Sequence, residues 1–356
     1  MLAEGEALPS LREIQEAYGV SMITARRSQA ELLAAGFAVR VTGRGLFVRD
    51  SKRAPRIALA IIGFSDEAWR RNTDMFGQLV GGVASAAWQR MATVNVLTFN
   101  DASIATPQLH DSLQDERLDG LLLRTAGDIT PDLVQLLRRR NVPFVSIKRE
   151  ARDFAIPFVR SDDERGAYLA TRHLLSLGHS RIGLLVTSAS TAQEFANGYA
   201  TAHDEYMVPL DPSLKVTTPT ALDADGERYG EALLRRPDRP TAIVASSDLL
   251  AVGLYRAAAH LSIDIPGQLA LVGFDDQEIA SHLQPPLTTV RISYYELGRR
   301  AAELLLLLID GLATNTGVLS EVELVIRGST APADPSYTRA LQQPTVLRPL
   351  SSANTP

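Results

Sequence analysis

Two adjacent arginines on a short helical stretch are the first residues with a recognisable chemical use. Arg26 and Arg27 lie in "GVSMITARRSQAELLAAGF", and the segment that follows, "AVRVTGRGLFV", carries Arg44 between two glycines. Residues 21–49 hold five arginines and one acid, Glu31, so this part of an acidic chain favours contact with phosphate. A solvated helix face beside a surface hairpin would have the same composition, and the arginines alone do not separate the two interpretations.

The elements around these arginines can be predicted from local signals. Ser10 followed by Glu13 predicts a capping box at the start of one helix, and Gly19 is expected to end it. Ser21 is a good N-cap for a second helix that should stop at Gly36. With Ala25 inward and 100° per residue, the outward positions are Ile23, Arg26, Arg27 and Ala30, and the inward ones Met22, Ser28, Gln29 and Leu32. Two short helices followed by a hairpin with its tip at 42–45 have helix-turn-helix geometry.

The whole stretch "LPSLREI…YGVSMITARRSQAELLAAGF…VTGRGLFV" resembles the winged-helix domain of GntR-family regulators from Leu8 to Val48. The resemblance implies a recognition helix over about 21–35 and a wing at 43–45, with double-stranded DNA as the partner. The DNA-binding candidates are Arg12, Ser21, Met22, Thr24, Arg26, Arg27, Gly43 and Arg44.

The chain departs from the GntR pattern in three places. Met22 stands where the family usually has arginine, and Gln29 stands where it usually has an inward leucine. The family also places a helix before "LPS", where this chain has seven residues. We therefore expect a start upstream of this one or an incomplete head, because so small a core cannot spare a helix.

The remainder of the chain alternates short apolar runs with amphipathic helices. Seven runs are expected to be strands covered on both faces: 56–62, 93–99, 119–123, 143–147, 181–187, 241–246 and 268–274. Such alternation predicts an α/β fold with parallel sheets, and about 270 residues suit two lobes. We expect a helix-turn-helix head at 1–49, a linker at 50–55, an effector domain at 56–330 and a disordered tail at 331–356.

The large domain resembles the effector domain of LacI/GalR regulators, which is itself similar to periplasmic sugar-binding proteins. The segments that carry the likeness are "RHLLSLGHSRIGLL", "ASSDLLAVGLYRAA", "IPGQLALVGFDD", "QPPLTTVRISYYELGRRAAELLL" and "VIRGST". The resemblance implies two α/β lobes joined by crossovers near 157–161, 289–291 and 322–324, with the effector in the cleft. A LacI-type domain behind a GntR-type head is similar to arabinose-responsive repressors.

Polar residues directly after strands are the candidates for effector contact, since open parallel sheets bind ligands at their carboxyl edges. Asp275 follows one strand and by resemblance binds hydroxyls; the alternative is that it caps a helix over 276–283, and it could do both. Ser247 follows another strand, and we expect the next residue, Asp248, to cap its helix. The effector-binding candidates are Phe64, Phe76, Lys148, Phe195, Ser247 and Asp275; of Phe64, Trp69 and Phe76, at least one should be core.

Two of these residues change the family's chemistry. Lys148 stands where the family has a ligand-binding aspartate, and Phe195 where it has a sugar-clamping arginine. A cation in place of an acid leads to the hypothesis of an anionic effector, such as a sugar phosphate or sugar acid, held by Lys148 and Arg149. The alternative is that Lys148 points to solvent or pairs with Asp275 or Asp162.

Composition and motifs exclude several classes of protein. The chain has no cysteine, and its six histidines show no metal-binding spacing, so neither a metal nor another cofactor is expected. It has no nucleophile elbow and no P-loop, which argues against an enzyme. The first residues do not form a signal peptide and no apolar run could span a bilayer, which predicts a cytoplasmic protein without membrane contact.

The expected function is that of a ligand-controlled transcription factor, by resemblance a repressor of carbohydrate metabolism genes. The alternatives are a solute-binding protein of a transporter and a sugar-processing enzyme. A homodimer is expected because one head reads too few base pairs, and the candidate dimer surfaces are the helices at 73–90, 248–262 and 276–283.

Overall fold

The structure is a computed structural model that describes most of the chain. The described residues are 6–34, 37–41, 45–48, 54–99, 109, 118–127, 129–148, 155–187, 191–313 and 317–333. The predicted wing tip with Gly43 and Arg44, Arg149, residues 50–53 of the linker and the tail from residue 334 lie outside them. Two compact units are present: Met1–Asp162, Ala189–Thr191 and Ile292–Val322 form unit 1, and Asp163–Ser188, Ala192–Arg291 and Glu323–Pro356 form unit 2.

The head has two helices and a hairpin: α1 (Leu11–Tyr18), α2 (Met22–Ala34), β1 (Ala38–Val41) and β2 (Gly45–Val48). The predicted capping box is confirmed, since Ser10 Oγ accepts from the Glu13 amide at 3.3 Å and the Ser10 amide donates to Glu13 Oε2 at 2.7 Å. Gly19 ends α1 at φ 64°. Ser21 Oγ accepts from the Thr24 amide at 3.2 Å, which confirms the predicted start of α2.

The buried stripe of α2 differs from the predicted one. Ala25 and Leu33 are buried, and Gln29 donates its side-chain amide to the Pro9 carbonyl at 2.8 Å. Met22 and Leu32, expected to face inward, are 44% and 37% exposed, and Ser28 is exposed as well. The prediction was wrong because α1 and β1 cover only one narrow stripe of α2, which holds Ala25, Gln29 and Leu33 at a spacing of four residues. Met22 and Leu32 lie beside this stripe and remain exposed.

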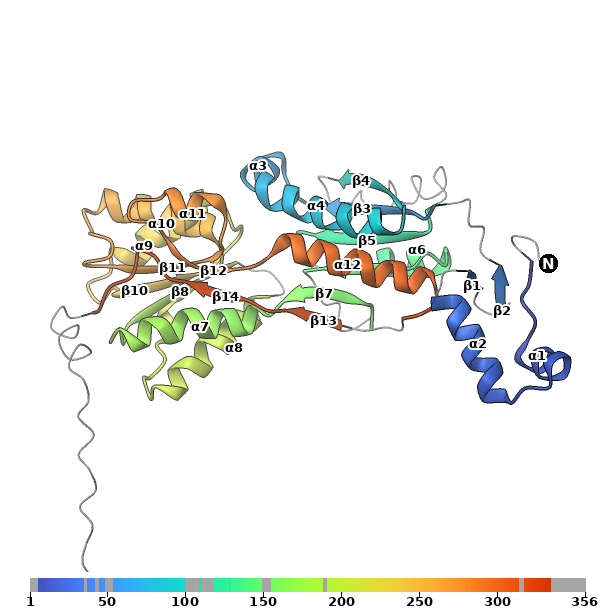
Figure 1. The fold of residues 1–356 in the computed structure, drawn as a ribbon. Coiled ribbons are helices and arrows are strands. Elements are labelled where there is room, and N and C mark those ends of the chain that lie inside the picture. The colour runs from blue at the N-terminus through green and yellow to red at the C-terminus, as the bar shows by residue number, and fades with distance from the viewer. Residues whose placement is uncertain are drawn as a thin grey trace, which may run out of the picture. The chain divides into compact units, whose positions relative to one another are not determined.

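Unit 1 contains a six-stranded parallel sheet in the order β13-β7-β6-β5-β3-β4. Its elements after the head are β3 (Arg56–Ile62), α3 (Asp66–Arg71), α4 (Thr73–Gln89), β4 (Thr93–Phe99), β5 (Gly120–Thr125), α6 (Pro131–Arg139), β6 (Phe144–Ile147), β7 (Phe158–Ser161), α12 (Tyr294–Ile309) and β13 (Gly317–Ser320). Alternate residues of β3 and β5 face opposite sides: Ala58 and Leu121 pack with Leu133 of α6, whereas Gly120 lies against Leu305 of α12. Helices α4 and α12 lie side by side (Figure 1).

Unit 2 contains a second six-stranded sheet in the order β14-β12-β11-β10-β8-β9, parallel except for the β12–β14 pair. Its elements are α7 (Asp163–Ser176), β8 (Ile182–Thr187), α8 (Ala192–Glu205), the 3₁₀ turn η2 (Pro212–Leu214), β9 (Lys215–Thr218), α9 (Asp223–Leu234), β10 (Ala242–Ala245), α10 (Asp248–His260), β11 (Ala270–Asp275), α11 (Glu278–His282), β12 (Thr288–Arg291) and β14 (Glu323–Val325). Helices α7 and α8 cover one face of this sheet, and α9 and α10 cover the other (Figure 1). The predicted α/β class with two parallel-sheet lobes is confirmed.

All seven predicted strands are present. The chain passes between the units after residues 162, 291 and 322, each within two residues of a predicted crossover, and also on either side of Ala189–Thr191, which was not predicted. The strands β7, β9, β12, β13 and β14 were not predicted. They are three or four residues long, and β9, β13 and β14 are edge strands with exposed positions, so they lack a continuous apolar run. No helix in the described part of the chain is long and apolar enough to cross a membrane.

Candidate functional site

Lys148 lies at the carboxyl edge of the unit 1 sheet, directly after β6. Its side chain is 9% exposed, and its ammonium donates to Ser161 Oγ, at the end of the neighbouring β7, at 2.6 Å. Its backbone has φ 70°, which is uncommon for a residue with a side chain. The alternative in which Lys148 points to solvent is wrong, because its side chain is buried at the sheet edge and its ammonium donates to the hydroxyl of Ser161 on β7.

An aromatic group stands at the same edge, after β3. Trp69 stacks on Phe76 with ring centroids 4.4 Å apart, and Phe64 meets Phe76 edge-on at 5.1 Å. Phe76 is only 2% exposed, so it is the core member of the three and supports the half-buried rings of Phe64 and Trp69. The Arg124 guanidinium lies 4.9 Å from the centre of the Phe64 ring and is 6% exposed.

Arg124 was missed by the sequence reasoning. The signal was available, since it is the one charged residue in the buried run "GLLLRT" of β5. A basic residue at the end of a buried strand is costly to desolvate unless it is paired or hydrogen-bonded. Together, Arg124 and Lys148 put two buried cationic groups on neighbouring strands of unit 1.

Asp275 was predicted to follow a strand and is itself the last residue of β11 in unit 2, with φ 106°. Helix α11 begins at Glu278 with Gln277 at its N-cap position, so the alternative of Asp275 as the N-cap is wrong. The left-handed backbone of Asp275, followed by Asp276 at φ 53°, marks this turn as strained.

The expected roles of Ser247 and Asp248 are reversed in part. Ser247 is the N-cap of α10: its hydroxyl accepts from the Leu250 amide at 3.1 Å and donates to the Ala221 carbonyl at 3.1 Å. Asp248, predicted as the cap, is fully buried and accepts from the Gln277 amide at 2.7 Å and from Thr289 Oγ1 at 2.6 Å. Burial, with the nearby Asp275 charge, raises the pKa of Asp248 well above its usual range.

Phe195 lies on α8 and is 3% exposed. Its ring packs 4.7 Å from that of Phe274, the residue before Asp275. Phe195, which stands where the LacI/GalR regulators have an arginine, therefore adds to the hydrophobic core beneath the end of β11.

The head residues proposed for DNA contact are exposed where the structure describes them. Arg12 donates to Glu16 at 2.9 Å and Arg27 to Glu31 at 3.1 Å, and both arginine side chains are more than 80% exposed. Such surface pairs contribute little, so a phosphate can replace the carboxylate. Thr24 and Arg26 are exposed on the same helix. Ser21 has a structural use as the cap described above.

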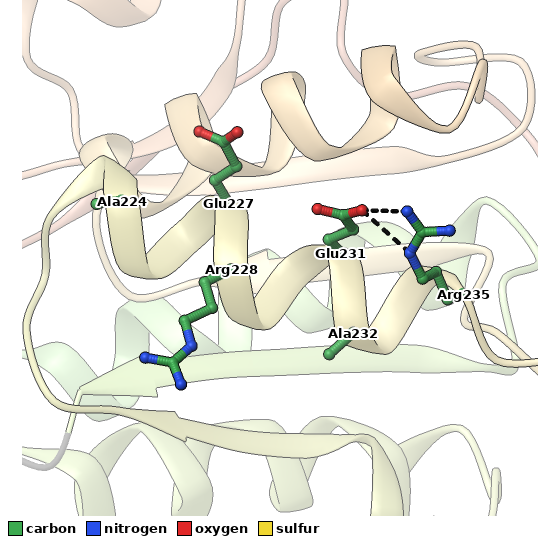
Figure 2. Close-up of a pocket in the computed structure, with 6 residues that line it drawn as sticks. All are labelled: Ala224, Glu227, Arg228, Glu231, Ala232 and Arg235. Atoms are coloured by element: carbon green, nitrogen blue, oxygen red, sulfur yellow. Dashed lines mark hydrogen bonds and ion pairs between the residues drawn. The ribbon is translucent and has the colours of Figure 1, made fainter.

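A hollow along α9 is lined by none of these residues (Figure 2). Its lining residues are Ala224, Glu227, Arg228, Glu231 and Ala232 of α9 and Arg235, which caps the end of that helix. Glu231 and Arg235 pair with each other, one turn apart. The hollow is therefore a shallow surface feature between paired charges.

Comparison with known proteins agrees with this arrangement. Residues 1–48 match the model of bacterial regulatory proteins of the gntR family, and residues 171–330 match the periplasmic binding protein-like domain. The HTH-type transcriptional regulator MalR of Streptomyces coelicolor is 32% identical over 269 residues, which cover 73% of this chain and 78% of that protein. The chain belongs to this family of helix-turn-helix transcriptional regulators and is not an enzyme.

Two further relatives show how far the likeness extends. The arabinose metabolism transcriptional repressor of Geobacillus stearothermophilus is 28% identical over 341 residues, covering 91% of this regulator and 92% of that protein. A LacI family transcriptional regulator from Enterococcus faecium, solved with bound ribose, is 26% identical with a TM-score of 0.66 and covers 78% of this regulator and 100% of that chain.

Proposed function

We propose that this regulator is a cytoplasmic repressor of carbohydrate metabolism genes that binds a two-fold operator as a homodimer and releases it when an effector binds. The effector is a sugar or a sugar-derived compound, and its candidate contacts are the polar and charged residues at the strand ends of each unit. The observation that carries the proposal is the joining of an exposed basic helix to two parallel sheets with polar and charged residues at their carboxyl edges.

The DNA-binding part of the proposal is supported by the exposed face of α2. Thr24 and Arg26 project from a helix whose opposite side is tied down by Ala25 and Leu33, so their positions are set by the head's small core. Arg12 and Arg27 supply phosphate contacts, and the hairpin β1–β2 supplies the wing. Gly43 and Arg44 complete the proposed wing.

The effector part of the proposal includes the charge of the ligand. Lys148 and Arg124 are more than nine-tenths buried, and Ser161 offers a hydroxyl 2.6 Å from the ammonium. An anionic group would receive charge-assisted hydrogen bonds from this set, which are about twice as strong as neutral ones. Asp275 would accept from sugar hydroxyls, and Phe64 would pack on the ring.

The coupling between ligand and operator follows from the connectivity of the chain. The chain passes between the units near residues 162, 291 and 322, and effector binding would change the conformation of these connecting segments. The linker at 50–55 would transmit the change from the effector domain (56–330) to the head (1–49). Coupling free energies of this kind are typically about 1–3 kcal/mol.

The experiment that tests this function is a thermal-shift screen of the full chain against neutral pentoses and hexoses, their phosphates and sugar acids. A ligand that binds only the folded state raises the melting temperature by mass action. We expect hits among the anionic compounds, and we expect Lys148→Met to abolish the shift.

The matched control is Lys215→Met, which removes an exposed lysine from β9 in unit 2 and should leave the shift unchanged. Hits from neutral sugars that survive Lys148→Met would contradict the anionic class while supporting a sugar effector. A screen without any hit would contradict the sugar effector itself.

A further inference from the structure

Asp276 is the centre of an ion-pair cluster in unit 2, and none of the residues of this cluster is among the proposed effector contacts. One carboxylate oxygen accepts from Arg291 Nε at 2.7 Å, and the other accepts from the Arg327 guanidinium at 2.6 Å. The Asp276 side chain is 9% exposed, so its carboxylate is largely shielded from water, whereas the Arg291 side chain is 47% exposed. Arg291 also reaches Glu323 at 3.3 Å.

The partners of Asp276 lie at the points where the chain crosses between the units. Arg291 is the last residue of unit 2 before the chain enters unit 1, and Glu323 is the first after it returns. The two residues are register partners in the antiparallel β12–β14 pair, and Asp275 of β11 is level with Arg291 on the other side. The Asp276 carboxylate thus binds one arginine in the segment that leaves unit 2 at Arg291 and one in the segment that returns at Glu323. It holds both segments against the turn at 275–276.

Arg327 strengthens the tie beyond the ion pair. Its guanidinium also donates to the Leu287 carbonyl at 2.8 Å, and its backbone amide donates to Thr288 Oγ1 at 2.9 Å. The outgoing segment before β12 and the returning segment after β14 are therefore held together independently of the strand ladder.

The turn that carries Asp276 is held in a strained conformation. Asp275 and Asp276 have φ values of 106° and 53°, a region that side-chain-bearing residues seldom adopt. The next residue, Gln277, is fixed by its amide hydrogen bond to the buried Asp248. Strain persists only where the surroundings over-determine the backbone, and here the surroundings are Asp248 on one side and the two arginines on the other.

We infer that Asp276 is a positioning residue that links Asp275 to the connecting segments. Its carboxylate fixes the backbone that presents Asp275 and holds the segments at 288–291 and 323–327, so a ligand bound at Asp275 changes the freedom of those segments. The inference rests on the proposed function insofar as Asp275 contacts the effector.

The test is hydrogen exchange of the full-length protein, measured on peptides that cover 286–294 and 320–328. Asp276→Asn keeps the shape and removes the charge, and we expect exchange at both segments to become at least tenfold faster. Asp223→Asn is the matched control, because Asp223 is equally buried and pairs with Arg256 at 2.7 Å on α9 and α10, away from the connecting segments. Arg291→Lys, on a half-exposed side chain, is a milder second variant that should give an intermediate rate.

The same measurement is repeated with saturating D-ribose 5-phosphate and with L-arabinose as the charged and the neutral probe. For a probe that binds wild type, we expect slower exchange at both segments, and we expect Asp276→Asn to lose this response. Equal exchange in Asp276→Asn and Asp223→Asn would overturn the inference, as would a probe response preserved in Asp276→Asn. If neither probe binds wild type, that result counts against the proposed function, and the exchange without ligand still decides the role of Asp276.

Discussion

Gly82 on α4 meets the backbone of α12 more closely than any side chain would allow. A Cβ atom placed at Gly82 would lie 1.9 Å from the Tyr295 carbonyl oxygen and 2.8 Å from the Arg299 nitrogen. Both are backbone atoms that cannot rotate away, so Gly82→Ala forces the helices roughly 1–2 Å apart to reach van der Waals separation. Overpacking of this kind costs about 1–3 kcal/mol or more, and we expect the upper end because Gly298 packs equally closely on the Leu79 backbone of α4.

The neighbouring glycine supplies a control with the opposite sign. A Cβ at Gly81 would lie 3.8 Å from the nearest atom, which is in the Tyr295 ring, and this is an ordinary contact. Gly81→Ala should therefore stabilise the helix by about 0.5–1 kcal/mol, because alanine loses less backbone entropy on folding.

The assay is thermal unfolding followed by circular dichroism and by tryptophan fluorescence, to which Trp69 on α3 and Trp88 on α4, both in unit 1, contribute. At roughly 2–4 °C per kcal/mol for a unit of this size, Gly82→Ala should lower the melting temperature of unit 1 by about 6–12 °C. Gly81→Ala should raise it by about 1–4 °C. Equal effects of the two substitutions would refute the close approach of α4 and α12.

Three further predictions concern DNA binding, capping and pH. Arg26→Ala should weaken binding to a duplex selected from a random library by about 1–3 kcal/mol, whereas Arg235→Ala, on the outer side of α9, should not; a loss below a few tenths would remove Arg26 from the contact set. Ser247→Ala should lower the free energy of unfolding of unit 2 by about 1–2 kcal/mol in urea titrations, because the α10 cap is lost; an unchanged midpoint would contradict the capping role. Burial lowers the pKa of His173 and His179, so the unfolded chain binds protons below about pH 6.5 that the folded chain does not. Stability of unit 2 should therefore fall as the pH drops from 7.5 to 5.5, and replacing both histidines with glutamine should flatten that slope; an equally steep slope would refute the assignment.

Much of the fold could be predicted from local sequence. The strands at 56–62 and 93–99 were predicted with their observed bounds, because turn signals flank each apolar run. The unpredicted β12 is four residues long, and its identity as a strand depends on pairing with β11 and β14. Short strands of this kind are decided by partners far away in the chain, which periodicity does not reveal.

The candidate site could be predicted in position but not in detail. The end of a strand identified Asp275, since parallel strands bring their carboxyl ends to one edge. Lys148 was identified by its place in the pattern of the LacI/GalR regulators. Whether a given side chain lies on the surface was decided by packing: Phe76 and Phe195 turned out to be core, and Met22 turned out to be exposed. Arg124 was overlooked because the predicted strand ended at residue 123, whereas β5 runs on to Thr125.

The sequence by itself determined the class of fold and the helix boundaries that depend on local hydrogen bonds. The capping box of Ser10 and Glu13 and the left-handed Gly19 involve residues within one turn of each other, so their chemistry can be read without a structure. The cluster around Asp276 could be found only in the tertiary structure. Its arginines are 15 and 51 residues away along the chain, and they meet the carboxylate because β11, β12 and β14 are neighbours in one sheet.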